Sequence, residues 1–320
     1  MNAADVPLAS LQLGECLGSG GQGKVFRLLN RPGEVLKLYF ATNANAATLD
    51  ALVAFPRSLP EIEREALSRQ TAWPLARVTK HGATVGFLMK EVPGAFLGRT
   101  QAGPRLRELQ YLLFPRSPLW GDIAPPGTLG RLEVAQAFAA LMRIFQDHGM
   151  VVGDVSLANL LWSPGFPARI YLIDCDSPTP AGRDSVLPQT DTPDWHDPLR
   201  PHTGPDVDTD RYKLALVIGR TLCADAYVRP GRPLKLPADL PDAVASAVTA
   251  CFAEAAGPHG TRPTAARWSQ ALRGRGEIRF GQPPVLRPSP PTLPMTPVQG
   301  SGPGRPRPTI TFKPSGGKAP

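Results

Sequence analysis

Three polar residues at fixed spacing constrain this chain more than any other feature. Asp154 is followed five residues later by Asn159, and Asp174 comes fifteen residues after that. The apolar run 170–173 before Asp174 predicts a buried strand that ends at this carboxylate. One carboxylate can receive the proton of an attacking hydroxyl, while a second carboxylate and an amide oxygen can hold Mg²⁺ against nucleotide phosphates. The spacing therefore predicts a phosphoryl-transfer site with Asp154 as its base.

A glycine-rich segment near the start of the chain predicts a phosphate-binding loop. The residues from 18 to 25 have the form G-x-G-x-x-G-x-V. A dinucleotide-binding fingerprint would lead into a helix, but here the β-prone run 24–29 and a turn at 30–33 follow. Glycines let backbone N–H groups approach a phosphate without interference from a Cβ. The residues expected to cover the nucleotide are Gly18, Ser19, Gly20, Gly23 and Val25.

The next apolar run, 34–40, predicts a strand with Lys37 at its centre. We expect this lysine to neutralise the α- and β-phosphates. Such a lysine needs a carboxylate from a neighbouring helix to hold it, and the segment 60–68 offers three glutamates. We favour Glu65, which lies nine residues before Pro74. The alternative is that all three glutamates are solvated and that the helix in question is the earlier segment 44–55, which has no glutamate.

With these residues in place, the chain resembles the bacterial serine/threonine protein-kinase-like family from about residue 11 to residue 272. The segments 85–94 and 173–177 look like a subgroup whose members often pair with PP2C-type phosphatases. Asp210 looks like the first residue of a buried helix, where it anchors the backbone of the catalytic loop. The Arg-Pro-Thr sequence at 262–264 looks like the start of the last helix.

Several positions depart from the family pattern. Gly153 stands where an arginine normally reads a phosphate on the activation loop, so we expect activity without phosphorylation of that loop. Ser156 replaces a lysine that would face the transferring phosphoryl group. Asp176 replaces a glycine. We expect Asp176 to be either a solvated or helix-capping acid or an additional metal ligand. Asp197-Pro-Leu replaces Ala-Pro-Glu, which predicts that Arg262 lacks its glutamate partner.

The resemblance implies an α+β, two-lobed protein-kinase-like fold with a small β-rich N-lobe and a larger helical C-lobe. We expect an N-terminal extension at 1–10, the N-lobe and hinge at 11–93, the C-lobe at 94–280 and a disordered Pro/Gly-rich tail at 281–320. The implied activity is an atypical serine/threonine protein kinase that uses ATP with Mg²⁺ or Mn²⁺. The implied site comprises the catalytic residues Asp154, Lys37 and Asn159, the metal ligands Asn159 and Asp174, and the nucleotide-binding residues Gly18, Ser19, Gly20, Gly23, Val25, Lys37, Glu65, Met89, Lys90 and Val92.

Two other functions fit parts of the pattern. A pseudokinase scaffold is favoured by Ser156, Asp176 and the missing arginine, and opposed by the intact Lys37 and Asp154. A small-molecule kinase of the aminoglycoside-phosphotransferase type is favoured by the Gly-Asp pair at 153–154. The residues at 210 and 262–264 argue instead for a protein-kinase C-lobe.

Charge and composition restrict the partners and the compartment. The formal net charge is +8, but residues 273–320 carry eight basic side chains and one acidic one, so the body is nearly neutral and nucleic acid is not an expected partner. The proline-rich tail is expected to dock on an SH3-like or acidic partner, or simply to aid solubility. The four cysteines lack metal-site spacing. Without a long apolar run or signal peptide, no membrane contact and a cytoplasmic location are expected.

Overall fold

The computed structural model describes residues 5–165, 167–188 and 192–274. The predicted tail at 281–320 lies outside the described residues. Within the part that is described, no helix combines the length and the apolar character needed to cross a bilayer.

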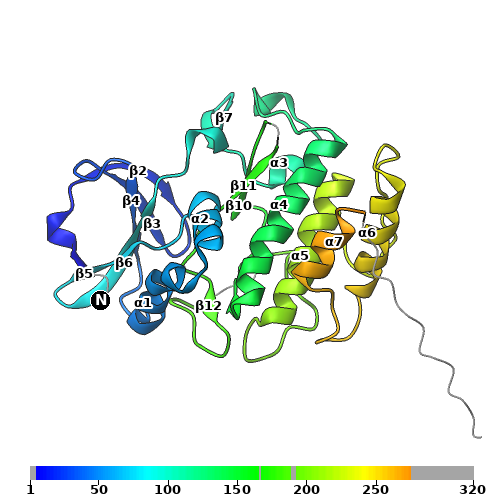
Figure 1. The fold of residues 1–320 in the computed structure, drawn as a ribbon. Coiled ribbons are helices and arrows are strands. Elements are labelled where there is room, and N and C mark those ends of the chain that lie inside the picture. Colours follow the sequence, from blue (N-terminus) through cyan, green and yellow to red (C-terminus); the bar gives the residue numbers. More distant parts are fainter. Residues whose placement is uncertain (1–4, 166, 189–191, 275–320) are drawn as a thin grey trace, which may run out of the picture. The chain divides into compact units, whose positions relative to one another are not determined.

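The N-terminal part is a six-stranded sheet, seen on the left of Figure 1. The strand order is β1-β5-β6-β4-β3-β2, and every pairing is antiparallel except that of β1 with β5. The expected N-terminal extension thus adds an edge strand to the sheet, followed by a short 3₁₀ turn. The strands are β1 (Val6–Pro7), β2 (Leu13–Ser19), β3 (Gly23–Leu28), β4 (Glu34–Tyr39), β5 (Ala76–Lys80) and β6 (Ala83–Lys90).

Two helices follow β4, and they correspond to the two segments that the sequence left as alternatives. They are α1 (Ala46–Ala54) and α2 (Glu61–Gln70). The side chain of Asn45 accepts a hydrogen bond from the N–H of Thr48 and so caps α1. Buried leucines of both helices belong to the same apolar cluster as Val35 and Met89 on one face of the sheet. The opposite face has its own small cluster around Leu36 and Leu88.

The segment between the lobes contains little helix. A hairpin of β7 (Leu97–Thr100) and β8 (Gly103–Leu106) comes first, and then the single helical turn α3 (Gln110–Leu113). Glycine and proline in this stretch favour turns over helix, which explains why only one turn of helix forms.

The C-terminal part is mainly helical, as predicted, and lies on the right of Figure 1. The long helix before Asp154 is α4, and the expected buried helix is α5, most of whose residues are buried. Short strand pairs, β9 with β12 and β10 with β11, border the site. The bounds are α4 (Thr128–Asp147), β9 (Met150–Val151), β10 (Leu160–Ser163), β11 (Arg169–Leu172), β12 (Thr179–Pro180), α5 (Val207–Cys223), α6 (Asp242–Glu254) and α7 (Ala265–Ala271).

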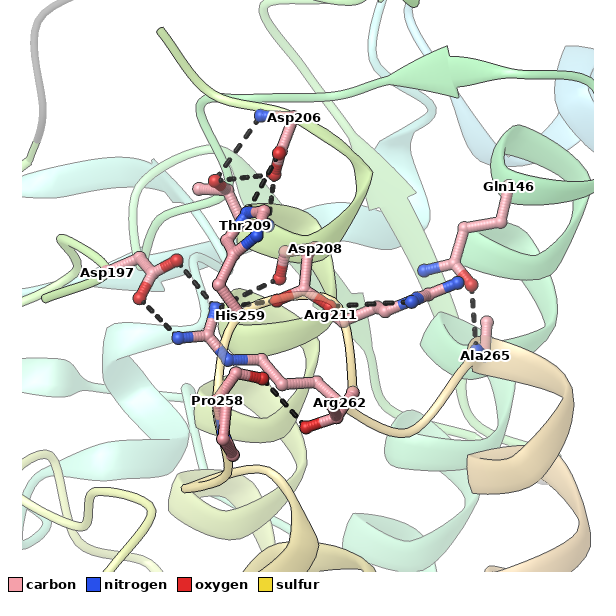
Figure 2. Close-up of polar contacts among 11 residues, drawn as sticks. Gln146, Asp197, Asp206, Asp208, Thr209, Arg211, Pro258, His259, Arg262 and Ala265 are labelled. Carbon is pink, nitrogen blue, oxygen red and sulfur yellow. Dashed lines mark hydrogen bonds and ion pairs between the residues drawn. The ribbon is translucent and has the colours of Figure 1, made fainter. Parts of the chain in front are cut away.

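Arg262 forms a buried ion pair that the sequence pattern did not indicate. Its guanidinium contacts both carboxylate oxygens of Asp197, at 2.6 and 2.8 Å, and Figure 2 shows it facing Asp197 and Asp208. Arg262 thus lacks the glutamate partner of the family pattern, as expected, but an aspartate before the proline takes the place of the glutamate after it. Thr264 caps α7, as predicted for the start of the last helix. These contacts connect the segment around Asp197, which belongs to the activation loop of the family pattern, to the helical core.

Candidate active site

The loop before Asp154 is held by the first turn of α5. The carboxylate of Asp210 accepts hydrogen bonds from the N–H groups of Val152 (2.6 Å) and Gly153 (2.9 Å). This confirms the prediction that Asp210 anchors the backbone of the catalytic loop. Burial raises the pKa of Asp210 to about 6, although both hydrogen bonds favour its charged form.

Gly153 is required by the shape of this loop. Its φ is +72°, and the N–H of Asp154 donates to the carbonyl of Val152 at 2.8 Å. These two features describe a tight three-residue turn of the kind that strains any residue with a Cβ. The glycine in place of arginine thus lets the chain turn sharply just before Asp154.

Asn159 fixes the orientation of Asp154. Its amide nitrogen donates to the backbone carbonyl of Asp154 (2.9 Å) and to a carboxylate oxygen of the same residue (3.0 Å). Because an amide carries its two donors on nitrogen, both contacts direct the Asn159 oxygen away from Asp154. That oxygen is thereby oriented to act as a ligand for a cation.

The other carboxylate oxygen of Asp154 faces Thr192, whose hydroxyl donates to it at 3.4 Å. Burial raises the pKa of Asp154, and nearby Asp174 acts in the same direction. The charge of Lys213 and the hydrogen bonds from Asn159 and Thr192 oppose this rise. Asp154 is therefore a half-buried carboxylate whose ionisation depends on its neighbours, as a general base requires.

Asp174 follows β11, the predicted strand, and reaches the site through an unusual backbone conformation. Its φ is +55°, the left-handed region that non-glycine residues seldom adopt, and its side chain is 41% exposed. The N–H of Ile173 donates to the backbone carbonyl of Asn159 at 2.9 Å. The segments carrying the two predicted metal ligands are thus bonded to each other directly.

Lys37 lies on β4 and points at two carboxylates. Its amine is 2.7 Å from an oxygen of Asp176 and 3.3 Å from one of Asp174. Burial disfavours the charged amine, but the two carboxylates outweigh burial, and the pKa of Lys37 is raised. At 2% exposure, Asp176 is neither a solvated acid nor a helix cap. The alternatives given for it from the sequence did not include this ion pair.

The structure corrects the prediction that Glu65 holds Lys37. Glu65 is more than half exposed on α2, and its carboxylate accepts from Arg69 of the same helix at 3.0 Å. Glu63 of that helix contacts His148 instead. The sequence pattern indicated a carboxylate at the right spacing, but the face of α2 that carries Glu65 is turned to solvent.

The glycine-rich loop joins β2 to β3, and different physical reasons account for glycine at its different positions. A Cβ on Gly23 would lie 2.3 Å from the carbonyl oxygen of Leu38, so sheet packing alone demands glycine there. A Cβ on Gly18 or Gly20 would meet no atom within 4 Å. Packing does not explain those two glycines, whereas the close approach of a ligand phosphate would. Ser19 is exposed at the end of β2.

The remaining predicted nucleotide-binding residues lie on β3, which carries Val25, and at and just after the end of β6. Val25 packs against the same apolar cluster as Met89, which is buried opposite Val35 in the β4–β6 ladder. The N–H of Glu91 donates to the carbonyl of Gly33 at 2.9 Å. Successive residues of extended backbone direct their peptide groups to opposite sides, so those of Lys90 and Val92 face away from β4. Adenine binding by these groups stays a prediction.

Comparison with solved structures identifies the fold, whereas comparison of sequences finds no match. No protein-family model and no curated protein matches the chain. The kinase domain of Mycobacterium tuberculosis PknI matches with a TM-score of 0.52 at 20% identity, over 85% of this chain and 98% of that one. The fold is that of a protein kinase domain. A double mutant of the same kinase domain matches with a TM-score of 0.51 at 18% identity, over the same shares of the two chains. The fold predicted from the sequence is confirmed.

Proposed function

We propose that this chain is an ATP-dependent protein kinase that transfers the γ-phosphate of Mg·ATP to serine or threonine hydroxyls of proteins. One observation carries the proposal. Asp154 and Asn159 are bonded to each other in one loop, and Lys37 is paired with Asp174 from the neighbouring loop. A base, an oriented amide oxygen, a carboxylate and an amine on adjoining segments form the set of groups that phosphoryl transfer requires.

Asp154 would accept the proton of the attacking hydroxyl. Asn159 holds the carboxylate of Asp154 in one orientation. One carboxylate oxygen accepts a hydrogen bond from Asn159, and the other faces Thr192. Lys37 would hold the α- and β-phosphates, because its amine is already fixed by two carboxylates and carries a positive charge. Phosphate positioning of this kind supplies much of the catalysis in enzymes that transfer phosphoryl groups.

The donors of Asn159 and Asp174 fit Mg²⁺ or Mn²⁺. The Asn159 oxygen is turned away from Asp154, and the Asp174 side chain is partly exposed. Mg²⁺ is commonly bound by one or two side-chain oxygens together with substrate phosphates and water, so two ligands suffice. When bound, the metal ion would neutralise charge on the phosphates. Asp176 is less suited to this role, because it is buried and paired with Lys37.

The nucleotide would lie between the sheet and the catalytic loop. The open space around Gly18 and Gly20 supports phosphate binding by the loop that also contains Ser19 and Gly23. Val25 and Met89 would contact the adenine ring, and backbone groups of Lys90 and Val92 would bond to it. We retain a PP2C-type phosphatase and an SH3-like or acidic partner of the tail as proposed partners, and the cytoplasm as the proposed compartment.

The proposal is tested by incubating the full chain with labelled ATP and Mg²⁺ or Mn²⁺, and mapping the phosphorylated residues. Wild type should label serine or threonine in itself or in protein substrates. Asp154→Ala should bind ATP normally and lose about 10²–10⁴-fold in rate. Asp147→Ala, an exposed acid at the end of α4, is the matched control. ATP binding without transfer would indicate a pseudokinase, and labelling of small molecules alone would indicate the phosphotransferase alternative.

A further inference from the structure

A cavity of about 690 Å³ adjoins Lys90, Glu91 and Pro93, at and just after the end of β6. Its walls come from the end of α2, from α4, and from β11 with the residues before it. None of the described residues that line it belongs to the glycine-rich loop or to the catalytic loop. Small molecules commonly bind in cavities of roughly 300–1,000 Å³. The cavity is therefore a candidate ligand site separate from the phosphate-binding groups.

Two buried polar atoms in the cavity wall have no hydrogen-bond partner in the part of the chain that the structure describes. They are the side-chain oxygen of Gln70 and the hydroxyl of Tyr171, whose side chain is 1% exposed. The two residues are neighbours, because Thr71 forms a β-bridge with Leu172. A buried polar group without a partner is costly. At the wall of a cavity, a bound ligand can supply the missing partners.

The rest of the wall is largely apolar and includes two aromatic rings. Phe96 and Tyr171 form a tilted pair with ring centroids 5.3 Å apart, and both line the cavity. Ile170 is buried beside Tyr171, and prolines 93 and 167 add further apolar surface. Aromatic rings pack favourably against other rings in tilted and offset arrangements. This wall therefore suits a ligand with a flat aromatic body.

Basic side chains outnumber acidic ones around the cavity. The charged lining residues are Arg69, Lys90 and Arg169 against Glu91 and Glu133. Arg69 and Glu91 already have ion-pair partners outside the wall. That leaves two cations, Lys90 and Arg169, against Glu133, whose carboxylate accepts from the N–H of Ala168 at 2.7 Å. The remaining charge is positive, so the cavity favours an anionic ligand.

We propose that this cavity binds a small aromatic anion that carries an N–H group beside its negative charge. The N–H would donate to the Gln70 oxygen, which can only accept. The Tyr171 hydroxyl would donate to the anionic group, and Lys90 and Arg169 would attract it. The site shares Lys90 with the proposed nucleotide site but none of the groups expected to hold phosphates. Both ligands should therefore bind at the same time.

The test uses the fluorescent dye anilinonaphthalene sulfonate (ANS), in the isomer whose N–H lies beside the sulfonate. The matched uncharged probe is phenylnaphthylamine, which lacks only the sulfonate. Titration of the full chain with ANS should show one saturable site. Saturating Mg·ATP should not displace the dye from this site. Both titrations measure binding alone, so they do not depend on phosphoryl transfer.

Variants of the cavity wall assign the site. Tyr171→Phe removes one hydroxyl and should weaken ANS binding roughly 10- to 100-fold, because a hydrogen bond to a charged group is lost. Arg169→Gln should weaken ANS binding roughly 2- to 5-fold, as expected for an exposed charge. Neither variant should change the binding of phenylnaphthylamine. The matched controls, Tyr227→Phe and Arg116→Gln at exposed positions outside the wall, should behave like wild type.

Unchanged ANS binding in both variants, or displacement of ANS by Mg·ATP, would place the dye elsewhere and overturn the inference. Equal loss of both dyes in Tyr171→Phe, with a lower melting temperature, would show that the hydroxyl is structural and would also overturn it. Should Tyr171→Phe not fold, Arg169→Gln decides: an effect on ANS alone supports the site, and equal effects on both dyes contradict it. ANS binding as expected without phosphoryl transfer would refute the proposed function and leave this site intact.

Discussion

The amine of Lys37 lies 2.7 Å from the carboxylate of Asp176, although 139 residues separate the two in sequence. Both side chains are buried, and Asp174 is a second, longer contact of the same amine. Asp176 thus holds Lys37 in the way that we expected of a helix glutamate. Because this carboxylate belongs to the loop that carries Asp174, the lysine is fixed without any contribution from α2.

Replacement of Asp176 by Asn should therefore weaken use of ATP. A hydrogen bond to a charged group contributes about 1.5–3 kcal/mol, so we expect kcat/KM for ATP to fall roughly 10- to 100-fold. Glu65→Gln should leave kcat and the KM for ATP close to their wild-type values, because Glu65 contacts Arg69 on the surface. Steady-state kinetics with varied ATP measure both variants. A large effect of Glu65→Gln with none of Asp176→Asn would reverse our interpretation.

Thr192 should influence the rate through its hydroxyl and not through phosphorylation. Its contact with Asp154 is 3.4 Å, longer than an ordinary O–H···O hydrogen bond, so we expect a contribution of only about 0.5–1.5 kcal/mol, and Thr192→Ala should lower kcat roughly 2- to 10-fold. Thr192→Ser should retain the rate, and so should Thr203→Ala, an exposed position. Thr190, a further hydroxyl of this segment, lies outside the described residues.

Phosphatase treatment of the wild type is the companion measurement for Thr192. Gly153 offers no cation to receive a loop phosphate, so treated and untreated protein should have equal rates. A loss of activity after treatment that matches Thr192→Ala would show that the loop phosphate, and not the hydroxyl, is required.

Asp210 should make stability depend on pH. Its pKa is raised from 3.8 to about 6 on folding, so the folded chain binds a proton more tightly than the unfolded chain does. This contribution is most favourable to the folded state at low pH, and it is lost as the pH rises from about 4 to 6. The loss is about 3 kcal/mol by pH 7. The unfolding free energies of wild type and Asp210→Asn can be measured by chemical denaturation between pH 4 and pH 7. The difference between the two proteins should change by about 3 kcal/mol over this range. A constant difference would contradict it.

The buried pair of Arg262 and Asp197 should be important for stability. Asp197→Ala removes the shorter of the two carboxylate contacts of the buried guanidinium and leaves only Asp208, so it should lower the unfolding free energy by up to about 3–5 kcal/mol. Arg262→Met should also be destabilising. The double variant should cost less than the sum of the single ones, because neither charge is then left alone. Strict additivity in denaturant titrations would mean that the two groups do not interact.

The sequence by itself determined the fold class and indicated most of the groups in the candidate site. The spacing of Asp154, Asn159 and Asp174, the glycine-rich loop and the central lysine of β4 are local patterns. They depend on turns, strands and helix caps that short segments form for their own physical reasons. The anchoring role of Asp210 was implied by the family resemblance and agrees with the structure.

Tertiary structure decided which charges meet. Lys37 pairs with Asp176 and not with Glu65, Arg262 with Asp197, and Lys213 with the Gly153 carbonyl. A short segment cannot reveal such contacts, because its residue spacing does not say which face of a helix becomes buried or how far a side chain reaches across the core. The available signals were an acid in place of a glycine, an acid moved to the other side of a proline, and a lysine one helical turn after Asp210. Burial converts these substitutions into ion pairs, since a charge removed from water must find a partner.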